Sequence, residues 1–196
     1  MANYNQVKRA QRLQLYYQSF VAKINKRGDN MKIVINAGHT KHGTGTGANG
    51  YLNESAETRK IAYELMKLLA DSKHEVIPAV YDRSANNLKE AVQIANTEGA
   101  DLFISIHLNA GGGTGCEAYT WKGQQVAQAV KACGNLNKLG FKNRGVKDGS
   151  NLYVIKSTKC TAILIEVCFV DNKADAELYK QVGYSNIAKA IYNAIV

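Results

Sequence analysis

Three ionisable side chains lie in or directly after apolar segments, where packing alone does not call for charge. His107 interrupts the run DLFISIHL, and Glu166 is the only charged residue in the run TAILIEVCFV. His39 follows the short β-branched run KIVIN after only Ala and Gly. A buried carboxylate without a partner costs several kcal/mol, so Glu166 needs either a partner or a chemical function.

These three segments have the composition of strands in a parallel sheet. In open α/β sheets, ligands bind outside the carboxyl ends of the strands, so the three side chains should reach one edge. Glu54 begins the helical segment after the first strand, which places it at the same edge. Two histidines and one carboxylate are a donor set of catalytic zinc sites, in which water takes the open position. We therefore predict that His39, Glu54 and His107 bind Zn²⁺, which leaves Glu166 as the general base.

Each of these residues also has a simpler interpretation. Asn53 and Glu54 suit the cap and the dipole of a helix N-terminus. His107 suits a hydrogen-bonded structural histidine, and Glu166 suits one half of a buried ion pair. The spacing between the residues is a weak pattern by itself, and their joint placement at one edge favours the metal site. His42 is a further possible ligand, and we interpret it as an exposed loop residue.

Strand and helix patterns alternate from residue 31 onward. We expect strands over 32–36, 75–81, 101–108, 116–121 and 161–170, helices over 54–69, 88–98, 124–139, 174–181 and 186–195, and a short extended segment over 152–155. This alternation predicts an α/β protein, a three-layer αβα fold with a mostly parallel sheet covered by helices on both faces. We assign residues 31–196 to a catalytic domain and residues 1–30 to a basic N-terminal extension.

The composition is that of a soluble globular domain with an unusual charge. Hydrophobic residues make up 45% of the 196 residues and charged residues 21%, while the net charge is +9. This charge favours an anionic partner. The sequence contains no recognised nucleic-acid motif, so a nucleic-acid-binding protein has only the charge in its favour. The four cysteines form no CxxC pair, which argues against a thiolate zinc site and favours reduced structural thiols.

The basic extension contains six lysines and arginines and one acid. Its apolar residues recur at three- and four-residue intervals, which is typical of a basic amphipathic helix able to lie on an anionic wall or membrane surface. A helix packed on the catalytic domain and a disordered tail are equally compatible with this pattern. The N-terminus lacks the features of a secretory signal. We therefore expect synthesis in the cytoplasm and action elsewhere only after release.

Residues 31–196 resemble the type 3 family of N-acetylmuramoyl-L-alanine amidases, and most closely the catalytic domains of phage and prophage endolysins of Gram-positive bacteria. The matching segments follow in family order: IVINAGH (33–39), LNE (52–54), SIHLNA (105–110), NRGVK (143–147) and IEVCFVDN (165–172). The resemblance implies zinc ligation by His39, Glu54 and His107 and a catalytic role for Glu166. These are the residues that the strand argument selects.

The activity implied by this resemblance is hydrolysis of bacterial peptidoglycan, at the amide bond between N-acetylmuramic acid and the L-alanine of the stem peptide. Asn109 and Arg144, which lie in two of the matching segments, are candidates for holding the substrate. The alternatives are another zinc peptidase that cuts within the stem peptide, and a non-catalytic basic protein that binds wall or nucleic acid. The intact set of ligands and Glu166 argues against a non-catalytic protein.

Overall fold

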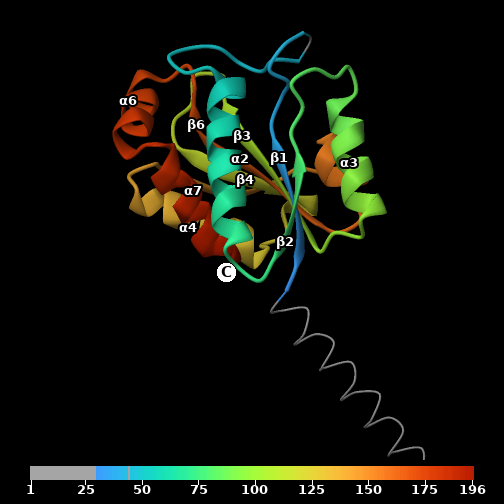
Figure 1. Ribbon diagram of the computed structural model, residues 1–196. Coiled ribbons are helices and arrows are strands. Elements are labelled where there is room, and N and C mark those ends of the chain that lie inside the picture. Colours follow the sequence, from blue (N-terminus) through green and yellow to red (C-terminus); the bar gives the residue numbers. More distant parts are fainter. Residues whose placement is uncertain (1–29, 44) are drawn as a thin grey trace, which may run out of the picture.

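A computed structural model describes residues 30–43 and 45–196 and shows one six-stranded sheet between two layers of helices (Figure 1). The basic extension, except Asn30, lies outside the described residues. The strands lie side by side in the order β2-β1-β3-β6-β4-β5. Their bounds are Lys32–Ala37 (β1), Glu75–Ala79 (β2), Leu102–Asn109 (β3), Cys116–Thr120 (β4), Asn143–Asp148 (β5) and Thr161–Phe169 (β6).

The strands of the sheet run mostly parallel, with one reversal. Strands β2, β1, β3 and β6 are parallel neighbours, whereas β4 pairs antiparallel with β6 and β5 pairs parallel with β4. The predicted fold class is therefore confirmed. Because of the reversal, β4 begins close to the edge at which β3 and β6 end, so residues early in β4 reach the edge predicted for the site.

Helices cover the two faces of the sheet unequally, and each face has its own apolar core. The larger core lies under α2 (Glu54–Ala70), α4 (Ala127–Lys138), α6 (Lys173–Val182) and α7 (Tyr184–Ile195). The smaller core lies under α3 (Asn87–Thr97) and α5 (Tyr153–Ser157). Among the described residues, no helix has the length and apolar character needed to cross a bilayer.

Side chains alternate between the two cores along each central strand, as the pleat requires. On β3, Ile104 and Ile106 pack into the larger core, while Phe103 packs into the smaller one. His107 lies on the same face as Phe103 because the two positions differ by an even number of residues. The smaller helical layer leaves room on this face for polar side chains near the strand ends.

Two segments differ from the sequence-based expectation. Residues 152–155 were expected to be extended, and this is wrong, since Tyr153–Ser157 forms the short helix α5. Burial of Val154 and Ile155 in the smaller core overrides the β-propensity of this run. The strand Asn143–Asp148 was not expected, because its mostly polar residues, half of them exposed, show no apolar alternation. It forms an edge strand that pairs with β4.

Candidate metal centre and active site

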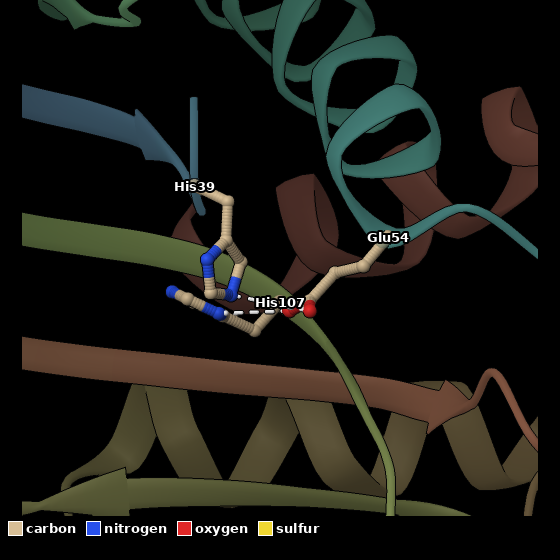
Figure 2. Close-up of side chains that lie close together, drawn as sticks. All are labelled: His39, Glu54 and His107. Atoms are coloured by element: carbon tan, nitrogen blue, oxygen red, sulfur yellow. Dashed lines mark hydrogen bonds and ion pairs between the residues drawn. The ribbon is translucent and has the colours of Figure 1, made fainter. Parts of the chain in front are cut away.

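Three side chains from three different elements meet at the predicted edge of the sheet (Figure 2). His39 follows β1, His107 lies near the end of β3, and Glu54 is the first residue of α2. The Glu54 carboxylate contacts both rings, with Oε2 3.1 Å from Nε2 of His39 and Oε1 3.0 Å from Nδ1 of His107. One ligand atom from each residue lies within 4.8 Å of the other two. The predicted convergence of these residues is therefore what the structure shows.

The three residues can offer one ligand atom each to a single metal ion, since these atoms lie within 4.8 Å of one another. The donor set of two imidazoles and one carboxylate suits zinc, with a fourth position left for water or substrate. His42, the further candidate, has an exposed side chain and lies outside this cluster.

Two glycines make the close approach of these side chains possible. A Cβ at Gly38 would lie 2.5 Å from Cε1 of the His107 ring, so this position accepts no side chain. A Cβ at Gly47 would lie 2.7 Å from Oε2 of Glu54 and 2.8 Å from Cδ2 of His39. Gly47 also has a φ of 78°, in the left-handed region. The loop after β1 therefore wraps around the ligand cluster at positions that only glycine fits.

His39 itself adopts a left-handed backbone conformation, with a φ of 68°. Non-glycine residues are uncommon in this region and are often found at functional sites. Two contacts hold the residue there: Nδ1 lies 3.1 Å from the carbonyl oxygen of Gly45, and the His39 carbonyl accepts a hydrogen bond from Arg59. Because Nδ1 is engaged by the loop, Nε2 is the nitrogen directed at Glu54.

Arg59 fastens this part of the site and was not found by the sequence analysis. Its buried guanidinium donates to the backbone carbonyls of Ser55, His39 and Tyr81. These bonds join α2, the loop after β1 and the segment after β2. A basic residue within the buried face of a predicted helix, as Arg59 is in α2, is the signal that identifies such a residue.

Glu54 is held as a carboxylate by its surroundings. Asn53 caps α2 by accepting a hydrogen bond from the backbone N–H of Ala56, which supports the capping interpretation, and it sets Glu54 at the first turn. The backbone N–H groups of Ala48 and Leu108 donate to the Glu54 carboxylate. Burial opposes ionisation, but hydrogen bonds with both histidines outweigh it and hold the pKa of Glu54 well below its usual range. Capping and ligand geometry are therefore compatible at this helix start.

Glu166 lies in the strand next to His107, and the two residues are register partners in the β3–β6 pair. Its Oε2 atom is buried and has no hydrogen-bond partner within the part of the chain that the structure describes. Burial raises the pKa of Glu166 to about 8, and the neighbouring carboxylates of Glu54 and Glu117 contribute to the shift. The interpretation of Glu166 as half of a buried ion pair therefore receives no support. Its free carboxylate oxygen is suited to proton transfer.

Asn109 and Arg144, the two candidates for substrate binding, are joined by a residue that the sequence analysis missed. Glu117, only 3% exposed, accepts hydrogen bonds from Nδ2 of Asn109 at 2.8 Å and from Nε of Arg144 at 2.6 Å. Tyr119 donates a third hydrogen bond to the same carboxylate. Although burial opposes it, hydrogen bonds from Arg144 and Tyr119 lower the pKa of Glu117. The signal for Glu117 was the one used for Glu166, a carboxylate within an otherwise buried strand.

Comparison with known proteins identifies relatives over the same part of the chain. The family model described as N-acetylmuramoyl-L-alanine amidase (Amidase_3) matches residues 33–196. The N-acetylmuramoyl-L-alanine amidase CwlM of Bacillus licheniformis is 34% identical over 173 residues, which cover 84% of this chain and 67% of the relative. An uncharacterised protein of Clostridium perfringens is 36% identical over 176 residues, 84% of this chain and 51% of the relative. The chain thus spans about half to two thirds of the length of these curated relatives.

A solved structure has the same fold. The catalytic domain of the CD27L endolysin, which targets Clostridia difficile, superposes with a TM-score of 0.76 at 33% sequence identity. The match covers 84% of this chain and 96% of that domain. From the family match and the shared fold, this chain belongs to the N-acetylmuramoyl-L-alanine amidase family Amidase_3.

Proposed function

We propose that the chain is a zinc-dependent amidase that hydrolyses the bond between N-acetylmuramic acid and the L-alanine of the peptidoglycan stem peptide. The observation that carries the proposal is the cluster of His39, Glu54 and His107, beside the partner-free carboxylate oxygen of Glu166. Membership of the amidase family supports the bond that is cut. The proposal extends to action on the cell wall after release of the enzyme.

The three ligand residues would hold zinc through Nε2 of His39, a ring nitrogen of His107 and the Glu54 carboxylate. A zinc ion held by these residues would lower the pKa of a bound water towards neutrality and would polarise the scissile carbonyl. Glu54 contributes a negative charge that its hydrogen bonds keep in place. Arg59 and Gly45 hold His39 in the conformation that presents Nε2.

Glu166 moves the proton in this proposal. Its Oε2 accepts a proton from the water that attacks the lactyl carbonyl of N-acetylmuramic acid, and then gives that proton to the nitrogen of L-alanine as the C–N bond breaks. The products are a free lactyl carboxyl group and a free amino terminus on the stem peptide. A single group serves best as base and then acid when its pKa lies near the working pH, which agrees with the raised pKa of Glu166.

The test is digestion of purified peptidoglycan by the full chain, with and without a metal chelator, followed by mass analysis. We expect intact glycan strands and stem peptides with a new N-terminal L-alanine, and no products after chelation until zinc is restored. A peptidase would instead release fragments cut within the stem peptide. Products of that kind, or full activity in the chelated protein, would refute the proposal.

We also propose that the basic extension, residues 1–30, holds the enzyme at an anionic wall or membrane surface. Six basic residues against one acid support this proposal. Attraction of this kind is screened over about 8 Å at physiological salt, so its contribution should fall as the salt concentration rises.

A further inference from the structure

Arg144 on β5 is held by the protein through only part of its guanidinium group. Nε donates to Oε2 of Glu117 at 2.6 Å, and the Cζ atom lies 5.0 Å from the centre of the Phe169 ring. The hydrogen bonds among residues 30–43 and 45–196 make no use of its two terminal nitrogens, and the side chain is 33% exposed. The outer edge of the guanidinium therefore faces solvent with two free N–H pairs in a fixed plane.

The position of Glu117 suits binding to Arg144 and not direct contact with a ligand. Its carboxylate is buried and both oxygens are occupied, Oε1 by Asn109 and Tyr119 and Oε2 by Arg144. Because Glu117 is already held by these hydrogen bonds, its side chain loses little conformational freedom when it also binds Arg144. Lys147, whose charge contributes to the low pKa of Glu117, adds a second positive charge on β5. Asp175 adds a further negative charge near Arg144, so the capacity to bind a ligand rests on the free terminal nitrogens of Arg144 and not on an unbalanced positive charge.

Strand register places Arg144 in line with the proposed catalytic residues. His107 pairs with Glu166, and Glu166 pairs with Glu117 across the antiparallel β4–β6 contact. Arg144 lies beyond Glu117 on the next strand. Neighbouring strands are about 4.8 Å apart, so the backbone of Arg144 lies on the order of 10 Å from that of Glu166, on the side away from the metal ligands. Its guanidinium lies beside the Glu117 carboxylate, which is only about one strand spacing from Glu166.

A bound stem peptide has the right length and chemistry to reach Arg144. An extended peptide advances about 3.3–3.6 Å per residue, so a span of roughly 5–10 Å corresponds to one to three residues beyond the scissile amide. On the glycan side, the lactyl carboxyl group of muramic acid is consumed in that amide. A free carboxylate within this reach must therefore come from the peptide. Arginine pairs with a carboxylate through two parallel hydrogen bonds, which two free terminal nitrogens can provide.

We propose that Arg144 binds a free carboxylate of the stem peptide, one to three residues from the bond that is cut, and that Glu117 is the residue that positions Arg144 for this contact. The proposal rests on the proposed amidase function. It makes the enzyme selective for stems that carry a carboxylate at this place over stems in which it is converted to a carboxamide.

The experiment uses two soluble muropeptides that differ only in whether the second stem residue carries a free carboxylate or a carboxamide. For the full zinc-loaded chain, kcat/KM should favour the carboxylate form by about tenfold or more, mainly through KM, as expected for a charge-assisted pair. In Arg144→Gln the ratio between the two substrates should fall to about one. Arg144→Lys keeps the positive charge but loses the two terminal nitrogens that make parallel hydrogen bonds, so in this variant the ratio should be intermediate. A ratio near one in the unsubstituted chain would overturn the proposal.

Glu117→Gln tests the positioning role. Because Glu117 also lies beside Glu166, its replacement can change turnover on both substrates, so the readout is again the ratio between them. We expect this ratio to fall in Glu117→Gln, while Lys67→Gln keeps the original ratio. Lys67→Gln is the matched control for Arg144→Gln, since it also removes one positive charge, at an exposed position about 20 Å from Glu54 along α2. An unchanged ratio in Glu117→Gln, with retained zinc, would contradict the positioning role.

A binding measurement separates this proposal from the proposed reaction. Calorimetric titration with the two released stem peptides, one with the carboxylate and one with the carboxamide, requires no hydrolysis. Tighter binding of the carboxylate peptide by the unsubstituted chain, lost in Arg144→Gln, would support the site even if the bond cut were a different one. Equal binding of the two peptides would overturn the site even if amidase activity is confirmed.

Discussion

Gly47→Ala should displace the side chains of the ligand cluster strongly while it lowers the stability of the fold only modestly. The new Cβ would lie 2.7 Å from Oε2 of Glu54 and 2.8 Å from Cδ2 of His39. An ordinary non-bonded separation is about 3.4 Å, so Oε2 must move by roughly 0.7 Å. Zinc–ligand distances tolerate shifts of only about 0.2 Å. The substitution should therefore remove one ligand, or two, from the arrangement that we propose binds zinc.

Gly45→Ala is the matched control, because Gly45 has nearly the same backbone conformation. Its φ is 77° against 78° for Gly47, but a Cβ at Gly45 would have no atom within 4 Å. Its carbonyl oxygen, which accepts a hydrogen bond from Thr40 and contacts the His39 ring, is unchanged by the substitution. Both variants should lose about 1–2 kcal/mol of stability from the left-handed conformation. Only Gly47→Ala should also displace ligands.

The assay is competition for zinc against a chromophoric chelator, with thermal unfolding of the metal-free proteins measured in parallel. We expect zinc affinity to fall by about 100-fold in Gly47→Ala and to stay close to the original value in Gly45→Ala. The metal-free proteins should unfold at similar temperatures. Equal zinc affinities for the two variants would refute the role given to Gly47 and would place the ion elsewhere.

The other predictions concern the ligands, the base, the buried arginine and the extension. His39→Ala and His107→Ala should each abolish zinc binding and hydrolysis; stoichiometric zinc by mass spectrometry in either variant would remove that residue from the ligand set. Glu166→Gln should keep zinc and lose turnover by roughly 10²-fold or more, and near-normal turnover would exclude it as the base. Arg59→Met should lower the free energy of unfolding by about 3 kcal/mol, because it leaves buried carbonyls unpaired; chemical denaturation within 0.5 kcal/mol of the original would contradict this estimate. Deletion of residues 1–30 should leave hydrolysis of soluble muropeptides nearly unchanged but reduce lysis of intact cells at low salt, and equal lysis would refute the targeting role.

The ligand cluster could be predicted because it depends on the most regular part of the sequence. The runs before His39 and around His107 are apolar enough to be assigned as central strands, and neighbouring parallel strands end at the same edge. Glu54 followed from the same argument, since its helix begins just after the first strand. The structure brings the three side chains together. Their function and that of Glu166 remain predictions.

The part of the site around Glu117 could not be predicted by the same argument. A strand pattern carries no information on strand direction, and β4 was placed without its antiparallel pairing to β6. The polar edge strand that carries Arg144 has no apolar periodicity, so the sequence gives no reason to place it beside Glu117. The helix α5 forms because its apolar side chains are buried in the smaller core. Local propensity does not encode this tertiary packing.

β5 is an edge strand of the sheet, and this position affects which part of the site unfolds first. A marginal strand is hydrogen-bonded on one side only, and such segments open locally at lower free energy than the centre of a sheet. His107 lies on β3, which is bonded on both sides, whereas Arg144 lies on β5. Fraying of β5 would therefore release Arg144 while the metal ligands stay in place. If zinc and the stem peptide bind as we propose, warming would reduce the discrimination between stem peptides before the metal is lost.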